Sequence, residues 1–131
     1  MVARGVTSNN VILTGGGYQA LLVKDYSTGV FIQNNIIDGG GQMGGNTSHN
    51  IYTSLASNQS ERYGWYLGVG EMVVTNKNAI FVDVANHDYR LKTNSPAIDA
   101  GIDVGWTSDL NGTSVPQGTW PDIGAYELPQ P

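Results

Sequence analysis

The stretch NNVILTGGG, from Asn9 to Gly17, returns 25 residues later as NNIIDGGGQ, from Asn34 to Gln42. Each copy joins an asparagine pair to a short aliphatic run and then to a glycine cluster. Glycine adopts corner conformations that residues with a Cβ resist, and asparagine tolerates left-handed geometry. A weaker third copy is SHNIYTS, from Ser48 to Ser54. The repeat predicts stacked turns of chain that each add short parallel strands to the same sheets.

Short apolar segments bounded by Gly, Asn, Asp or Ser predict strands along the first two thirds of the chain. They are Val11–Thr14, Ala20–Lys24, Val30–Gln33, Ile36–Asp38, Asn50–Thr53, Glu71–Thr75 and Ala79–Val82. Several are continuous apolar runs, such as ALLV, which indicates strands covered on both faces, as in parallel sheets. No window shows the apolar stripe of a helix, which disfavours a βαβ fold. Parallel strands without helices favour a solenoid, and an antiparallel sandwich with similar hairpins is the open alternative.

The composition limits the class of protein. The chain has 131 residues, enough for one domain, with 18 glycines and no cysteine, which excludes disulfides and thiolate metal sites. The net charge is −5 with six scattered Lys and Arg, so we expect no nucleic-acid partner. No apolar run is long enough to span a membrane, and the first residues lack the apolar core of a signal peptide. We therefore expect no membrane span, with any export signal removed or lying upstream.

The last third of the chain has a distinctive ending. IFVDVANHDYRLKTNSPAIDAG (Ile80–Gly101) is followed by PDIGAYE (Pro121–Glu127). Together these segments resemble the C-terminal end of right-handed parallel β-helix proteins of the pectate-lyase-like superfamily. The resemblance implies an all-β fold, a short right-handed parallel β-helix (solenoid) closed by a C-terminal cap. It divides the chain into coils at 1–78 and a last coil and cap at 79–131. Within the coils, the stretch 39–46 is too rich in glycine for a strand interior, and we expect it and the stretch 57–70 to be loop excursions.

The resemblance also implies a setting and a partner. The ending is shared by polysaccharide lyases, glycoside hydrolases and surface proteins, so we expect a bacterial extracellular or cell-surface location and a polysaccharide or oligosaccharide partner. Relatives often carry an arginine where this chain has Val115, and its absence removes an ion pair that would order the loop. Repeat-like sequence begins almost at Met1, so we expect the last coils of a longer protein. An uncapped first coil predicts a homo-oligomer.

Two carboxylates are candidates for catalysis. Glycosidases place a pair of carboxylic acids on either side of the scissile bond. Asp38 ends the second aliphatic run, and Glu61 lies in an aromatic loop beside Arg62. The alternatives are a corner aspartate that binds backbone amides and a solvated ion pair. Sequence spacing predicts no pairing between the two carboxylates.

One short segment carries oxygen ligands at alternate positions. SDLNG places Asp109 and Asn111 two residues apart and before Gly112, as at the start of a calcium loop. No acid falls at the position that closes such a loop, so a plain turn is the alternative. Calcium is the one cofactor that the sequence indicates.

Three aromatic residues lie close together in SNQSERYGWYLGVG, from Ser57 to Gly70: Tyr63, Trp65 and Tyr66. Sugar faces stack on Trp and Tyr rings, which combine an apolar face with a polar tip. We expect these rings to bind carbohydrate, and the alternative is that they cover the side of the solenoid. Trp106 and Trp120, near the ending motifs, are expected to pack over the coil end.

Three hypotheses about function follow. The first is a carbohydrate-directed β-helix module, the C-terminal part or a small relative of a polysaccharide lyase or glycoside hydrolase. The second is a non-enzymatic surface segment that acts in adhesion or self-association. The third is a complete small glycosidase or lyase.

Overall fold

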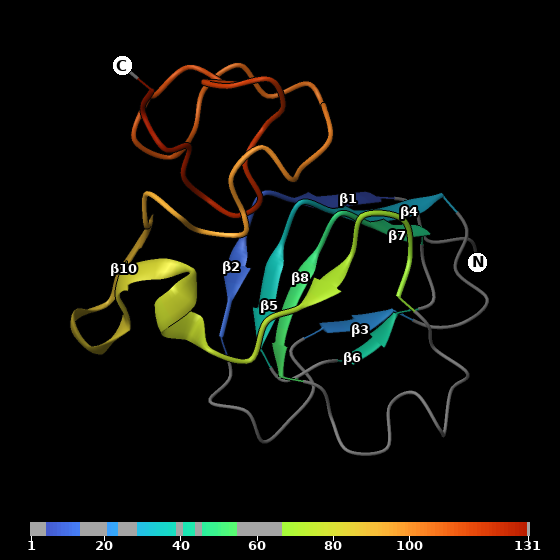
Figure 1. The fold of residues 1–131 in the computed structure, drawn as a ribbon. Coiled ribbons are helices and arrows are strands. Elements are labelled where there is room, and N and C mark those ends of the chain that lie inside the picture. The colour runs from blue at the N-terminus through green and yellow to red at the C-terminus, as the bar shows by residue number, and fades with distance from the viewer. Residues whose placement is uncertain are drawn as a thin grey trace.

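The computed structural model describes residues 5–13, 21–23, 29–38, 41–43, 46–54 and 67–130. These residues form short strands and two single-turn 3₁₀ helices, followed by a long irregular C-terminal segment (Figure 1). In chain order the elements are β1 (Gly5–Ser8), β2 (Val11–Ile12), β3 (Leu21–Val23), β4 (Val30–Gln33), β5 (Ile36–Asp38), β6 (Gly41–Met43), β7 (Asn46–Ser48), β8 (Ile51–Ser54), β9 (Met72–Val73), η1 (Lys77–Ala79), β10 (Phe81–Asp83), η2 (Val84–Asn86) and β11 (Asp88–Leu91).

Strands β1 to β9 pair in parallel and form three sheets. Their strand orders are β1-β4-β7, β2-β5-β8-β9 and β3-β6. In the largest sheet Val11 aligns with Ile36, Ile36 with Ile51, and Ile51 with Met72. The two NN copies are therefore neighbours in space, because the aliphatic runs that follow them are adjacent strands. Within the segment expected to leave the fold as a loop, Gly41–Met43 forms β6.

Each strand of the largest sheet follows a corner whose first residue has left-handed backbone geometry. These residues are Asn9 at φ 55°, Asn34 at 60°, His49 at 54° and Gly70 at 69°. Glycine and asparagine enter this region more easily than other residues. An added Cβ at Gly70 would collide with the ring of His49. Geometry at the corner thus accounts for the first asparagine of each NN pair and for glycine at the fourth corner.

The residue after each left-handed position links neighbouring corners through its side chain. Asn10 Nδ2 donates to Asn35 Oδ1 at 3.0 Å, and Asn35 Nδ2 donates to Asn50 Oδ1 at 3.0 Å. Asn50 Nδ2 then donates to Glu71 Oε2 at 2.6 Å, and the hydroxyl of Tyr52 donates to the same oxygen at 2.7 Å. The second asparagine of each pair therefore belongs to an amide ladder that ends on a carboxylate.

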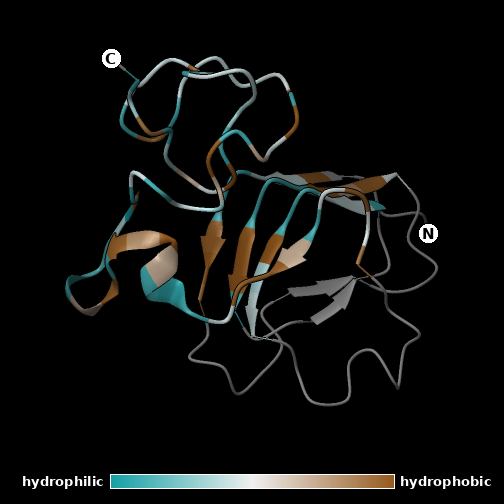
Figure 2. Ribbon diagram, in the orientation of Figure 1, coloured by the Kyte–Doolittle hydropathy of each residue, from teal (hydrophilic) through white to brown (hydrophobic). Residues whose placement is uncertain are grey.

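The central strands of the largest sheet, β5 and β8, are buried on both faces. Ile36 and Ile37 are neighbours in β5 and point to opposite faces, yet both are fully buried. One face packs in a core cluster formed with the C-terminal third of the chain, which contains Ile36, Ile51, Ile80, Phe81, Leu91, Ala97 and Ile123. Figure 2 shows apolar residues along the strands of this sheet and in the adjoining 3₁₀ and β10 region. Burial on both faces explains why the strand sequences are continuously apolar.

The irregular C-terminal segment packs on the corners that precede β2 and β5. The backbone N–H of Gly124 donates to the Asn34 carbonyl at 2.8 Å, and Asn34 Nδ2 donates to the Ile102 carbonyl at 2.6 Å. Asn9 Nδ2 donates to the carbonyls of Asp122 and Gly124 at 3.4 and 3.3 Å. In Figure 1 the segment, coloured orange to red, lies over one end of the sheets. Segments about a hundred residues apart in the sequence thus form one face of the molecule.

The prediction of a single right-handed parallel β-helix is wrong. Strands β10 and β11 pair antiparallel, with Phe81 opposite Leu91 and Asp83 opposite Asp88. The four residues between these strands are too few for the crossover that parallel pairing needs, which takes about a dozen residues or more. The chain instead turns back through η2 and His87, which is left-handed. The parallel strands lie in separate sheets, and the described residues do not close them into a solenoid.

Candidate ligand-binding cleft

A cleft of about 610 Å³ lies between the first corner and the C-terminal segment. Its floor comes from Ser8 to Val11, at the turn from β1 to β2, and one wall comes from Tyr89 of β11. The remaining wall is formed by residues 106–110 and 122–127, which include the DIGAYE motif. A volume of this size is within the ordinary range of about 300–1,000 Å³ for small-molecule sites.

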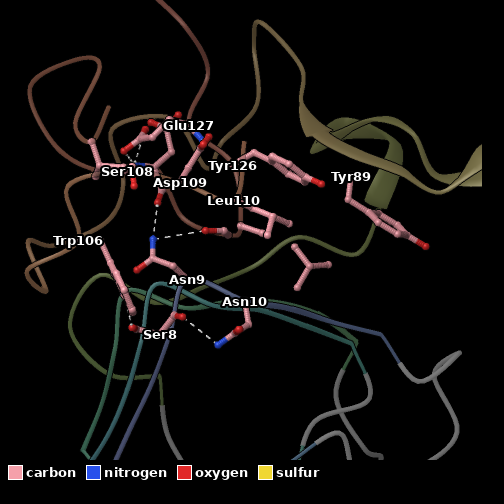
Figure 3. A pocket seen from close by; sticks show the side chains of 15 residues that line it. Ser8, Asn9, Asn10, Tyr89, Trp106, Ser108, Asp109, Leu110, Tyr126 and Glu127 are labelled. Carbon is pink, nitrogen blue, oxygen red and sulfur yellow. Dashed lines mark hydrogen bonds between the residues drawn. The ribbon is translucent and has the colours of Figure 1, made fainter. Parts of the chain in front are cut away.

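Aromatic side chains stand on opposite sides of the cleft. Figure 3 shows Trp106 on one side and Tyr126 and Tyr89 on the other, with Leu110 between them. Trp106 is 56 % exposed, and its Nε1 donates to Ser8 Oγ at 3.0 Å, which fixes the indole against the end of β1. The ring of Tyr89 packs edge-on against Phe81 with centroids 5.3 Å apart. The rings are therefore held by the protein while part of their surface faces the cleft.

Amide and hydroxyl groups line the floor beside these rings. Asn9 holds the C-terminal segment through the two carbonyls named above, and Asn10 Nδ2 donates to the Ser8 carbonyl at 2.9 Å. Ser108 adds a hydroxyl from the opposite wall and pairs with Ser114 in a short antiparallel bridge. Apolar rings beside groups of this kind make a surface that can bind both the faces and the hydroxyls of a polar ligand.

Carboxylates hold the C-terminal wall in place. Asp109 Oδ1 accepts the N–H groups of Asn111 and Thr113, each at 2.8 Å, and its Oδ2 accepts the N–H of Glu127 at 2.8 Å. Asp122 accepts the N–H of Asp99 at 2.8 Å and that of Leu128 at 2.7 Å. These bonds fix the loop, in which Val115 lines the cleft and donates its backbone N–H to the Thr107 carbonyl at 3.1 Å.

Glu127 is the most perturbed acid of the cleft. Its side chain is 5 % exposed, and its two carboxyl oxygens accept the N–H of Asp122 at 3.2 and 3.1 Å. Burial raises the pKa of Glu127 to about 8, and a hydrogen bond with the Asp122 side chain and the negative charge of Asp122 act in the same direction, whereas the backbone N–H of Asp122 lowers the pKa. Glu127 therefore holds a proton through much of the physiological pH range, and it lies next to Asp122, whose carboxylate accepts two backbone N–H groups.

Asp38, a catalytic candidate from the sequence, lies in a buried ion pair away from the cleft. Its side chain is 1 % exposed, and Lys77 Nζ lies 3.1 Å from its Oδ2. Thr53 and Ser54 donate hydroxyls to its Oδ1 at 3.0 and 2.7 Å. Burial opposes ionisation, but hydrogen bonds from Ser54, Lys77 and Thr53 outweigh it and lower the pKa of Asp38. This environment stabilises a permanent carboxylate that joins β5, β8 and η1.

The other candidates from the sequence have different outcomes. Glu61, Tyr63, Trp65 and Tyr66 lie outside the described residues. The proposed calcium ligand Asp109 uses both oxygens to accept backbone N–H groups, and Asn111 is exposed at the same turn. Within the described part of the chain, no group of three or more His, Cys, Asp and Glu side chains is arranged to hold a metal ion.

Sequence reasoning missed the residues that line the cleft. Trp106 was expected to pack over the coil end, and Tyr89 and Tyr126 were treated as parts of the ending motif. The clue was present, since Trp106 follows Gly105 in a polar stretch and both tyrosines stand beside charged residues. Their approach to Ser8–Val11 depends on tertiary packing, which no local pattern encodes.

No family model matches the chain, and neither a curated protein nor a solved structure matches it. Among the described residues, no helix has the length and apolar character needed to cross a membrane.

Proposed function

We propose that this chain binds carbohydrate, with the sugar in the cleft between the first corner and the DIGAYE wall. The main support is the exposed indole of Trp106, which is held by its hydrogen bond to Ser8 and faces Tyr126 and Tyr89 across the cleft. A pyranose ring buries its apolar face on such rings and directs its hydroxyls to the surrounding amides and carboxylates.

Two features of the sequence support a sugar over other small ligands. The SPAIDAG and DIGAYE segments resemble the ending of pectate-lyase-like proteins, many of which act on polysaccharides, and DIGAYE supplies a wall of this cleft. The net charge of −5 disfavours phosphate-bearing ligands, because those depend on clustered Lys and Arg. An extracellular or cell-surface location is part of the same proposal.

A glycan array tests this function with a matched pair of tryptophan variants. Trp106 and Trp120 are similarly exposed, at 56 % and 53 %, but only Trp106 lines the cleft. We expect wild type and Trp120→Ala to bind the same glycans and Trp106→Ala to lose at least about tenfold in affinity, since stacking on one aromatic is worth on the order of 1–2 kcal/mol. Thermal melting of each variant checks that the fold is retained. Equal loss in both variants, or no binding by wild type to any glycan, contradicts the proposal.

We also propose that copies of the chain associate through their first strands. Strands β1, β2 and β3 each stand at the outer position of a parallel sheet, and no other described strand pairs with their outer edges. Val6 in β1 is exposed, so Val6→Lys places a charge on this edge without disturbing the core. Light scattering should show an oligomer for wild type and a smaller species for the variant. A monodisperse monomer at high concentration contradicts self-association.

A further inference from the structure

We infer that the cleft selects uncharged glycans and rejects chains of uronic acids. The inference rests on the proposed carbohydrate function and specifies its substrate class. It follows from the charges and the hydrogen-bonding groups that the cleft presents.

The walls of the cleft carry acids and no cations. Asp109, Asp122 and the protonated Glu127 are among the lining residues, of which the two aspartates supply negative charge, and no Lys or Arg of the described part of the chain lines the cleft. Of the three described Lys and Arg residues, Lys77 pairs with Asp38, Arg90 pairs with Asp88, and Lys92 does not line the cleft. A carboxylate group of a ligand would therefore meet like charges in a partly enclosed space, where solvent screens them less than in bulk water.

The hollow next to the cleft does not supply the missing cation. It shares Tyr126 and Glu127 with the cleft and also contains Arg90. Arg90 donates from Nε to Asp88 Oδ1 at 2.8 Å, and its Nη2 lies 2.5 Å from Asp88 Oδ2. This two-point contact occupies the guanidinium with its own partner, so a long glycan that reaches the hollow still meets no unpaired cation there.

The acids of the cleft are also fixed in position. Asp109 accepts three backbone N–H groups, and Asp122 accepts two, so neither can turn away from an incoming anion without breaking the wall. A carboxylate accepts hydrogen bonds, and a sugar hydroxyl can donate to the carboxylate lone pairs that the backbone N–H groups leave free. A uronate offers another acceptor at C6 where an uncharged hexose offers a donor. The hydrogen-bonding chemistry and the charge thus favour the same ligand class.

The test compares an uncharged oligosaccharide with the same oligosaccharide after oxidation of its C6 hydroxyls to carboxylates. Isothermal titration is run at about 0.01 M and about 1 M NaCl, between which the screening length falls from about 30 to about 3 Å. We expect the uncharged form to bind with little salt dependence and the oxidised form to bind at least about tenfold more weakly at low salt. High salt should narrow that difference, because it screens the repulsion.

A pair of variants separates cleft charge from overall charge. Asp109→Asn removes a charge from the wall, whereas Asp103→Asn removes one from an exposed aspartate that does not line the cleft. We expect only Asp109→Asn to narrow the difference between the two ligands, and the salt series decides the matter if that variant does not fold. Equal or tighter binding of the oxidised form overturns the selectivity and leaves carbohydrate binding in place. Failure of both ligands, and of every glycan on the array, overturns the proposed function itself.

Discussion

Replacement of Asn35 by alanine should be among the most damaging single substitutions in this fold. The side chain is fully buried at the second corner. Its Oδ1 accepts from the backbone N and the Nδ2 of Asn10 at 3.1 and 3.0 Å. Its Nδ2 donates to Thr7 O, Gln33 O and Asn50 Oδ1 at 2.9, 3.0 and 3.0 Å. One amide therefore joins three corners of the ladder to the end of β1.

The magnitude follows from these five contacts. Each hydrogen bond contributes about 1 kcal/mol net, and shared donors and acceptors reduce the sum, so Asn35→Ala should lower the free energy of unfolding by about 4 kcal/mol. That is a large part of the total of about 5–15 kcal/mol for a domain. Asn46 in β7 is the control, because it is exposed and its Nδ2 makes a single hydrogen bond to a described residue, to the Val30 carbonyl at 3.3 Å. Asn46→Ala should cost under about 1 kcal/mol.

Urea unfolding followed by circular dichroism measures both variants. With an m-value of about 2 kcal/mol per molar, the Asn35 variant should unfold at a urea concentration about 2 M lower than wild type. The Asn46 variant should stay within about 0.5 M of wild type. If the two variants lose similar stability, the amide ladder does not hold the corners and the explanation of the sequence repeat fails.

Three further predictions address the corners and the buried acids. Gly70→Ala should cost more stability than Gly105→Ala in thermal melts. Both positions have positive φ, but only at Gly70 would the added Cβ collide with a neighbouring ring, so the cost at Gly105 is backbone strain alone, at most about 1–2 kcal/mol. Equal losses of stability in the two variants would contradict the collision. The raised pKa of Glu127 means that the folded state keeps a proton that the unfolded state loses above about pH 4.5, so the free energy of unfolding should fall as pH rises from about 5 to about 8. Glu127→Gln should flatten that profile in urea titrations, and an unchanged slope would assign it to another group. Lys77→Met should lower the free energy of unfolding by about 2–3 kcal/mol, because it leaves buried Asp38 without its cation. This is less than the usual figure for a buried ion pair, since two hydroxyls still bind the Asp38 carboxylate. A loss under about 0.5 kcal/mol would contradict the role of the ion pair.

The sequence predicted the first corners and strands β2 to β5 and β8 because their causes are local, whereas β1, β6 and β7 were not predicted. Asparagine and glycine at left-handed positions and aliphatic runs after them are visible in one dimension, and the 25-residue offset between Asn10 and Asn35 appears directly as a side-chain contact. The later offsets of 15 and 21 residues, from Asn35 to Asn50 and from Asn50 to Glu71, are harder to see in the sequence. The third corner replaces the first asparagine of the pair with His49, and the fourth corner replaces both, with Gly70 and Glu71. Histidine and glycine meet the same backbone requirement at those corners.

The hairpin and the cleft could not be predicted because their causes are distant in the sequence. The short connection through η2 decides that β11 runs antiparallel, yet VDVANHDYRL contains no glycine turn that marks a hairpin. The cleft joins Asn9 to Asp122 and Trp106 to Ser8, at separations of 113 and 98 residues. Candidate acids were therefore sought in the repeats, whereas the perturbed acid, Glu127, lies in the ending motif.

The most direct test of carbohydrate binding in the cleft is an NMR titration of the tryptophan indole N–H groups. The chain has three tryptophans, and Trp106→Phe and Trp120→Phe assign two of the three indole resonances. Addition of a bound glycan should shift the Trp106 resonance, whose N–H donates to Ser8 at the cleft, and leave that of Trp120 in place. A glycan that shifts the Trp65 or Trp120 resonance while leaving Trp106 unchanged would contradict the assignment of the sugar site to this cleft.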